Sequence, residues 1–389
     1  MKAIANFLKF RRYCTHEKVQ RKILPIVDSK ECIPEPELDV EFFCNPANRD
    51  QIFENIKRRK SCGDIDKVLY LCQKPELKHL LLNELSRIPN LTHPATLNIG
   101  NHPEISKLCG SPPEFDFQPT EFEKLAVKMR LLRMDALGPV SGHRSYIFLG
   151  DLADLEQALI HYTIEKLTTQ GFKIVSVPDI LPTKVIERCG LIVDGDRTLV
   201  YQLAPHYGDE FSLSGTAEMA LAYQLMNSTL EHDELPLKMA AVSRCYRAEA
   251  SSLADERGIY SLGLHFKVLN MPPCELGAPA FRKTDMEGWL PGRNIFGELS
   301  SCSNCTDFQS RRLNIKYKTK DGNSVYVHTL NGTACAVPRM LIAICETHQL
   351  KNGTIAIPNN LQPFMNGKTV IRQQAVPDMR TYKYKPKVM

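Results

Sequence analysis

Apolar residues recur at helical spacing in the first quarter of the chain. Leucine and isoleucine residues form one such stripe between positions 77 and 88, which predicts a core-facing helix over Pro75–Arg87. Asp64 is placed to cap a shorter helix before it, and residues 48–59 predict a third. The pattern therefore predicts a helical region over residues 36–94.

Further helices are predicted beyond this region. Two prolines and an asparagine interrupt residues Ile88–Pro94, which predicts a linker. A strong amphipathic pattern then covers Asp151–Thr169 and ends at Gly171. Residues Met219–Thr229 and Ala336–Gln349 also predict helices, the second of them buried.

Three apolar runs predict strands. Residues Ile174–Val177 predict a buried strand that stops at Pro178, and Lys238–Tyr246 and Val325–Leu330 predict two more. Strands and helices do not alternate regularly, which disfavours a doubly wound parallel sheet. We therefore expect a single α+β domain over residues 115–389.

Charge is concentrated at the N-terminus. The chain has 389 residues and a net charge of +5, and residues 1–25 hold seven Lys or Arg against one acid. Such a basic, acid-poor leader is typical of a mitochondrial targeting segment, although a disordered basic tail has the same composition. The remainder is nearly neutral, and no apolar run is long enough to cross a bilayer, so we expect no membrane partner.

The thirteen cysteines show no framework spacing, which indicates reduced thiols inside a cell. Cys302 and Cys305 form a CxxC pair. A zinc site needs a second pair at ligand spacing, and none follows, so we interpret both as small buried residues.

Thr216, Ala217 and Glu218 precede a predicted helix. The hydroxyl of Thr216 can simply cap that helix. Alternatively, the Thr hydroxyl and the Glu carboxylate can form a small polar pocket that binds the amino group of an amino acid.

Two arginines are candidates for binding phosphates. Arg247 and Glu249 lie two residues apart on a predicted extended segment and so share a face, where a guanidinium can grip an α-phosphate. A solvated ion pair is the alternative. Arg339 begins a predicted helix after a run of small residues, Gly332–Pro338, that lets a ligand approach the backbone.

The stretch Glu298–Ile315 is dense in polar groups. Glu298 stands before the hydroxyls of Ser300, Ser301 and Ser303, and a carboxylate beside hydroxyls can hold Mg²⁺ against phosphates. An acid that closes a strand is the alternative.

The order of these elements along the chain resembles that of class II aminoacyl-tRNA synthetases. From about Leu38 to Met365 the chain is similar to seryl-tRNA synthetases, and most of all to the animal mitochondrial ones. The segments that carry the resemblance are Ser141–Tyr146, Leu213–Glu218, Cys245–Glu249, Trp289–Arg293, Glu298–Leu313 and Thr333–Arg339.

The resemblance implies a fold, a reaction and a set of sites. The fold is an antiparallel sheet flanked by helices, with an N-terminal helical arm that holds tRNA. The reaction activates serine with Mg·ATP and transfers it to tRNA(Ser). The implied sites are catalytic Arg247 and Arg339; Thr216, Ala217, Glu218, Arg247 and Thr333 for serine; Arg247, Glu249, Glu298, Ser301 and Arg339 for ATP; and Glu298 and Ser301 for Mg²⁺.

The chain departs from the family at two places. After Tyr260 it lacks the returning strand of the second motif and the helix that follows. The missing residues include an aromatic that stacks on adenine, an Arg near the γ-phosphate and a Glu that binds serine. The arm is also short, because its second helix, Pro75–Arg87, spans only about 20 Å. Contact with tRNA would depend on basic residues of the run 57–60.

Two functions are compatible with this sequence. The first is a serine–tRNA ligase of the mitochondrial matrix, impaired in this chain by the missing segment. The second is a non-catalytic synthetase-like protein that binds tRNA or a related subunit. We also expect a dimer, with itself or a related chain, through residues 151–178. The apolar residues expected there are Leu152, Leu155, Leu159, Tyr162 and Leu167.

Overall fold

The computed structural model describes residues 33–59, 63–134, 146–193, 198–204, 206, 210–247 and 262–373. The chain divides into two compact units at Ile33 and Pro34, and almost all of the described residues belong to the second unit. The predicted targeting segment, residues 1–25, lies outside the described residues. Within those residues, no helix has the length and apolar character needed to cross a membrane.

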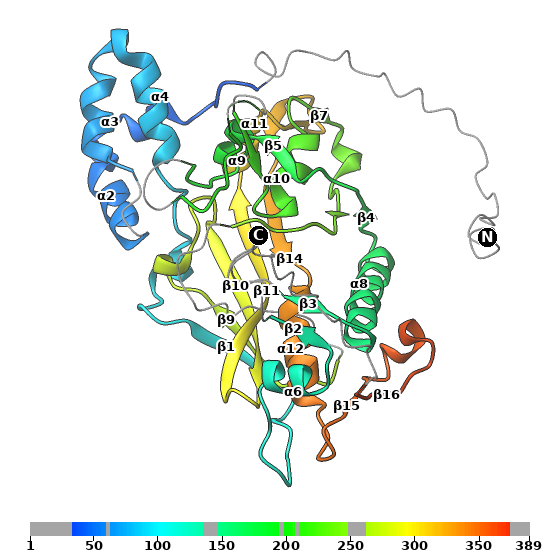
Figure 1. Cartoon of the computed structure of the whole chain (residues 1–389). Coiled ribbons are helices and arrows are strands. Elements are labelled where there is room, and N and C mark those ends of the chain that lie inside the picture. Colours follow the sequence, from blue (N-terminus) through cyan, green and yellow to red (C-terminus); the bar gives the residue numbers. More distant parts are fainter. Residues whose placement is uncertain are drawn as a thin grey trace, which may run out of the picture. The chain divides into compact units, whose positions relative to one another are not determined.

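The N-terminal part of the second unit is a group of short helices (Figure 1). Its elements are α1 (Val40–Phe43), η1 (Pro46–Asn48), α2 (Arg49–Arg58), α3 (Ile65–Cys72), η2 (Pro75–Leu77) and α4 (Lys78–Arg87). Asp64 caps α3 by accepting hydrogen bonds from the backbone N–H groups of Asp66 and Lys67, as predicted. Apolar residues of these helices form a core of their own, centred on Ile52, Val68 and Leu85.

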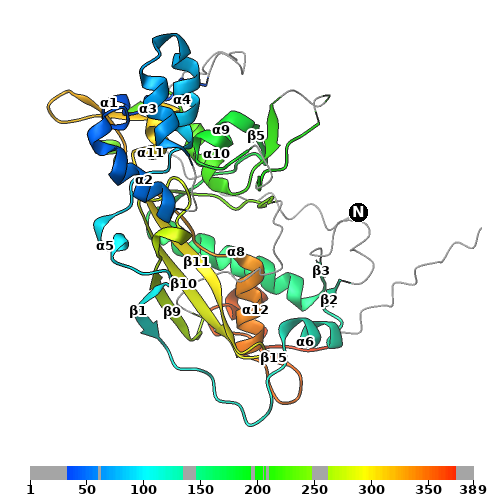
Figure 2. The ribbon, with the colours of Figure 1, turned by 90° about the vertical axis from the view of Figure 1, so that its left-hand side faces the viewer.

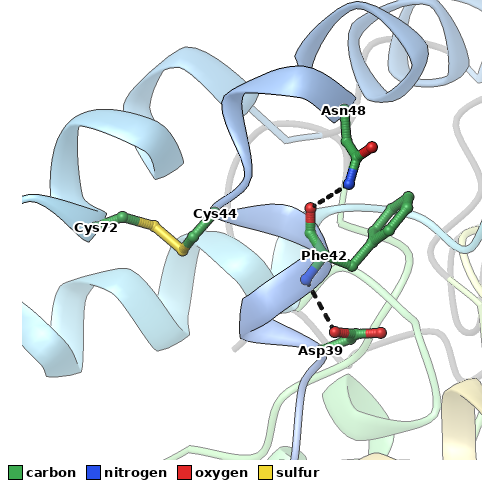
Figure 3. The surroundings of a disulfide bond; sticks show 5 residues. All are labelled: Asp39, Phe42, Cys44, Asn48 and Cys72. Atoms are coloured by element: carbon green, nitrogen blue, oxygen red, sulfur yellow. Dashed lines mark hydrogen bonds between the residues drawn. A yellow bond between two sulfur atoms is a disulfide. The ribbon is translucent and has the colours of Figure 1, made fainter.

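A disulfide joins α1 to α3 in this helical group (Figure 3). It links Cys44 to Cys72 across 28 residues of sequence, with 6.0 Å between their Cα atoms. The expectation that the cysteines are reduced is therefore wrong for this pair. Beside it, Asp39 accepts a hydrogen bond from the N–H of Phe42, and Asn48 donates to the carbonyl of Phe42.

A buried arginine helps to fasten the helical group to the rest of the unit. Arg59 is 2% exposed and donates to the carbonyls of Asn90 and Ala278 at 2.9 and 3.2 Å. The Asn90 side chain donates onward to the Cys305 carbonyl at 3.0 Å. Arg59 therefore holds the linker in place and is not available to tRNA, which corrects that part of the prediction for residues 57–60; Lys60 lies outside the described residues.

A five-stranded antiparallel sheet forms the centre of the unit (Figure 1). Its strands, in spatial order, are β1 (Glu104–Cys109), β9 (Phe266–Asn270), β10 (Arg282–Leu290), β11 (Ile295–Thr306) and β14 (Thr329–Thr333). The smaller sheets are β4 (Lys173–Ile174) with β8 (Met239–Ala240); β5 (Ile180–Pro182) with β6 (Phe211–Leu213); β7 (Thr229–Leu230) with β12 (Lys316–Lys318) and β13 (Ser324–Tyr326); β2 (Leu132–Arg133) with β3 (Ile147–Phe148); and β15 (Ile355–Ala356) with β16 (Val370–Ile371).

Helices cover one face of the large sheet. Helix α12 (Val337–Thr347) packs on β10 and β11, and α8 (Asp151–Thr169) packs on α12 (Figure 2). Leu299 of β11 fits into this layer because Gly288 of the neighbouring strand β10 has no side chain: a Cβ there would lie 2.2 Å from the Leu299 Cδ1 atom. The remaining helices are α5 (Pro94–Leu97), α6 (Phe122–Lys128), α9 (Thr183–Arg188), α10 (Ala217–Gln224), α11 (Phe308–Leu313), η4 (His232–Glu234), η5 (Pro273–Glu275) and η6 (Gln362–Met365). The predicted α+β class, an antiparallel sheet flanked by helices, is confirmed.

The predicted helices agree with the structure better than the predicted strands do. Helix α8 has the predicted bounds, whereas α10 stops at Gln224 because Asn227 adopts a positive φ of 58°. The run Val325–Leu330 is divided between β13 and β14, which belong to different sheets. The run Ile174–Val177 is wrong as a buried strand, since β4 ends at Ile174 and that side chain is 43% exposed.

The predicted strand Lys238–Tyr246 is also mostly absent. Only Met239 and Ala240 form a ladder, in parallel with β4. An extended segment becomes a strand when a neighbour forms a ladder with it, and beyond Ala240 the described residues show only single bonds, such as that from the Tyr246 N–H to the Ser214 carbonyl at 3.0 Å.

Candidate active site

A β-bulge in β11 brings the predicted metal-binding residues to one face of the large sheet. Glu298 is opposite Glu287 of β10, and Ser301 is opposite Asp285. Residues three apart on a regular strand face opposite ways, but the register shifts here because Leu299 is an extra residue in β11. Glu298 and Ser301 therefore share the face that α12 does not cover.

The same face continues across β14. Ser301 is paired with Thr333 and Ser303 with Asn331, so these four side chains form a hydroxyl-rich and amide-bearing surface. Gly332 permits the close pairing, since a Cβ there would lie 2.3 Å from the Ser301 carbonyl oxygen. The small size of Gly332 thus serves strand packing.

Thr216 and Glu218 approach this surface from the start of α10. Thr216 is the N-cap of the helix, and its hydroxyl accepts a hydrogen bond from the Glu218 N–H at 3.1 Å. The capping interpretation of Thr216 is therefore correct. The cap also orients Glu218, whose Oε1 accepts from the side chains of Asn331 at 2.8 Å and Gln309 at 2.5 Å.

The surroundings of Glu218 shift its pKa in opposite directions. Burial is the main influence and raises the pKa of Glu218, while the Gln309 hydrogen bond and the positive charge of Arg247 lower it. Arg247 lies close by, with its Nε donating to the Gly215 carbonyl at 3.3 Å. The geometry thus places one predicted phosphate-binding arginine beside the predicted amine-binding carboxylate.

Arg339 lies in the first turn of α12, directly after β14. Its N–H donates to the Ala336 carbonyl at 3.0 Å, within the turn that follows the run of small residues. The residues predicted to bind serine come from three parts of the chain. The start of α10 provides Thr216, Ala217 and Glu218, the segment after β8 provides Arg247, and β14 provides Thr333. Glu249, also predicted to bind ATP, lies outside the described residues.

Comparisons with known proteins show the family to which the chain belongs. Residues 260–348 match the family described as tRNA synthetase class II core domain (G, H, P, S and T). The chain is 37% identical over 344 residues to a mitochondrial serine–tRNA ligase of Mus musculus, covering 78% of this chain and 66% of that one. It is 34% identical over 403 residues to the mitochondrial serine–tRNA ligase of Bos taurus, covering 92% and 77%. The chain belongs to the serine–tRNA ligase family.

A solved structure supports the same assignment. The seryl-tRNA synthetase of Pyrococcus horikoshii, in its complex with ATP, matches with a TM-score of 0.70 and 26% identity, covering 86% of this chain and 90% of that one. Of the segments that carried the resemblance to serine–tRNA ligases, Ser141–Tyr146 lies almost wholly outside the described residues, as does Glu249 in the second motif.

Sequence reasoning missed the two amides that hold Glu218. Gln309 stands in the polar stretch that was singled out, but 91 residues separate it from Glu218. Asn331 lies 113 residues away from Glu218, one position after the predicted strand Val325–Leu330. Gln309 comes from α11 and Asn331 from β14, and no local pattern predicts that these two elements meet at Glu218.

The two cysteines of the CxxC pair differ in exposure. Cys305 is fully buried, as expected, but Cys302 is exposed, which corrects the prediction for that residue. Burial raises the pKa of the Cys305 thiol to about 12, so it is an unreactive thiol at neutral pH. Within the described ranges, no three His, Cys, Asp or Glu side chains are grouped to hold a metal ion.

Proposed function

We propose that this protein is a mitochondrial serine–tRNA ligase in which one segment of the active site is missing. The observation that carries the proposal is the position of Glu218. Its carboxylate lies at the hydroxyl-bearing surface of β11 and β14, beside Arg247, with one oxygen held by Gln309 and Asn331. A carboxylate suits the ammonium group of serine, and hydroxyls suit its side chain.

The charged groups suit the first half of the reaction. In this proposal Arg247 and Arg339 bind phosphates of ATP and neutralise charge as the serine carboxylate attacks the α-phosphate. Glu298 and Ser301 present oxygen atoms on one face, which is the donor chemistry that Mg²⁺ requires. When bound, Mg²⁺ would offset the negative charge of the phosphates. The protein's own part is to position serine and ATP.

The location and the tRNA partner are further parts of the proposal. The mouse and bovine relatives are mitochondrial serine–tRNA ligases, which supports the interpretation of residues 1–25 as a targeting segment for the matrix. The helical group of α2, α3 and α4 corresponds to the tRNA-binding arm. Helix α4 has 10 residues and is about 15 Å long, so this arm can contact only a small part of tRNA(Ser).

A missing segment is supported by the alignment and by the sheet. The alignment with the bovine relative runs over 403 residues, more than the 389 of this chain, so that relative has residues without a counterpart here. In the described structure, β14 pairs with β11 alone, and Leu330 on it is 73% exposed. A returning strand after Tyr260 would give the segment that follows Ala240, which forms no ladder within the described residues, a strand to pair with.

Aminoacylation of tRNA(Ser) tests this function. The full chain and a form that carries the corresponding bovine segment after Tyr260 are each given tRNA(Ser), ATP and radiolabelled serine. We expect charging by the completed form, with serine preferred over alanine and threonine. If the completed form charges tRNA(Ser) with none of these amino acids, the ligase proposal is wrong and the non-catalytic alternative is favoured.

Dimer formation through residues 151–178 is a further prediction, and the structure narrows it to part of that segment. Leu152, Leu155, Leu159 and Tyr162 are buried in the core of their own subunit, whereas Leu167 is half-buried. Instead, Ile174 and Val242 on the β4–β8 segments are 43% and 54% exposed. We propose that a second copy of the chain covers them, in the isologous pairing that is commonest among oligomers.

Val242→Glu should convert the dimer into a monomer, because it places a charge in a closed apolar interface. Light scattering at micromolar concentration measures the mass. Leu108→Glu is the matched control: Leu108 is 60% exposed on β1, at the far edge of the large sheet, and should leave the dimer intact. A monomeric wild-type chain, or a dimer that survives Val242→Glu, would contradict the proposal.

A further inference from the structure

A chain of three side chains leads away from the proposed serine site into the protein interior. The hydroxyl of Thr329 donates to Oε1 of Gln309 at 2.7 Å, and Nε2 of Gln309 donates to Oε1 of Glu218 at 2.5 Å. Gln309 is 2% exposed, so it cannot itself contact a ligand. Asn331 reaches the same oxygen of Glu218 from the other side, at 2.8 Å.

We infer that Gln309 is a positioning residue for the serine ammonium group, acting through Glu218. This inference rests on the proposed function. Both amides bind Oε1, and no hydrogen bond to Oε2 is present among the described residues. The carboxylate is therefore fixed in rotation with Oε2 left to accept from the ammonium group.

The orientation of the Gln309 amide is itself determined. Its oxygen accepts from Thr329, and its nitrogen also approaches the Cys189 carbonyl at 3.4 Å. A flipped amide would set its oxygen against both the Glu218 carboxylate and the Cys189 carbonyl. Only the observed orientation therefore allows the Gln309 amide to form these hydrogen bonds. Thr329 thereby ensures that Gln309 presents a donor to Glu218.

The donor also affects the charge of Glu218. Burial favours the neutral acid, and a hydrogen bond given to the carboxylate favours the ionised form that an ammonium group requires. Removal of the Gln309 donor would raise the pKa of Glu218. Serine binding should then weaken, and weaken most at low pH, where the acid is protonated.

Two ligands that differ only in the amino group test this role. One is a non-reactive seryl-adenylate analogue, and the other is its des-amino counterpart, built on 3-hydroxypropanoate. Titration calorimetry gives the Kd of each for the full chain, for Gln309→Met and for Thr329→Val. The matched control is Gln349→Met, which removes another buried glutamine, one that lies just after the end of α12 and bonds the backbone of Thr120.

Gln309→Met should weaken the seryl analogue about 10- to 100-fold, since a hydrogen bond to a charged group is lost. The des-amino analogue should bind Gln309→Met as it binds the wild type. The deficit for the seryl analogue should shrink as the pH rises, because Glu218 then ionises in the variant too. Thr329→Val should show a smaller effect of the same kind, Thr329→Ser should restore binding, and Gln349→Met should show no preference between the two ligands.

Two results would overturn the inference while the proposed function stands. One is an equal loss for both analogues in Gln309→Met, which would indicate a purely structural role. The other is unchanged binding of the seryl analogue in both Gln309→Met and Thr329→Val. Thr329→Val keeps the test valid should Gln309→Met fail to fold. If the wild-type chain binds both analogues with the same Kd, Glu218 does not bind the amino group. That result would overturn this part of the proposed function and, with it, this inference.

Discussion

The 389-residue chain is expected to activate serine at least about 100-fold more slowly than the form completed with the bovine segment after Tyr260. By resemblance, the missing residues include an Arg near the γ-phosphate, an aromatic that stacks on adenine and a Glu that binds serine. A single electrostatic group in such a site is worth about 3–4 kcal/mol, which is two to three orders of magnitude in rate. Serine-dependent ATP–pyrophosphate exchange measures the step directly.

The structure gives a second reason for this loss. Only Met239 and Ala240 of the predicted strand Lys238–Tyr246 form a ladder in the described part of the chain, and β14 pairs with β11 alone there. A returning strand would complete the surface that positions ATP, and positioning contributes directly to the rate. Exchange by the unmodified chain on the order of 1 s⁻¹ or faster would contradict the prediction.

The matched control is an insertion of equal length and unrelated sequence after Tyr260. If activity depends on the strand and its side chains, this insertion should leave exchange at the level of the unmodified chain. Rescue by the unrelated insertion would show that length alone was lacking, and the assignment of the missing segment to the second motif would then be wrong.

Local signals made the helices predictable. Helix α8 was bounded correctly because its apolar period is strong and because Gly171, with φ of 82°, ends it where few other residues could. Thr216 was likewise recognisable as a cap, since capping depends on residues two or three positions apart.

Strand pairing decided the features that the sequence could not reveal. The apolar run Lys238–Tyr246 has the composition of a strand, yet most of it forms no ladder within the described residues. Glu298 and Ser301 were proposed as a pair, but their shared face depends on the extra residue Leu299, which no composition predicts. Arg59 seemed to be a surface base and is instead buried against carbonyls more than 200 residues away.

Arg247→Ala is expected to reduce kcat/KM for ATP in the completed form about 100- to 1,000-fold. The guanidinium would neutralise the α-phosphate as negative charge builds up during adenylate formation, and the loss of such a group costs about 3–4 kcal/mol. The structure adds that Arg247 lowers the pKa of Glu218, so its removal also favours the neutral acid and weakens serine binding. The KM for serine should therefore rise together with the fall in kcat.

Two further variants, Arg247→Lys and Arg244→Ala, test whether the effect belongs to the guanidinium of Arg247. Lysine keeps the charge but loses the planar pair of donors, so Arg247→Lys should recover only part of the activity. Arg244 is exposed three residues earlier on the same segment, and Arg244→Ala should stay within about twofold of the completed form, as surface charges usually do. A kcat/KM for ATP that is unchanged in Arg247→Ala would show that this guanidinium does not bind the α-phosphate.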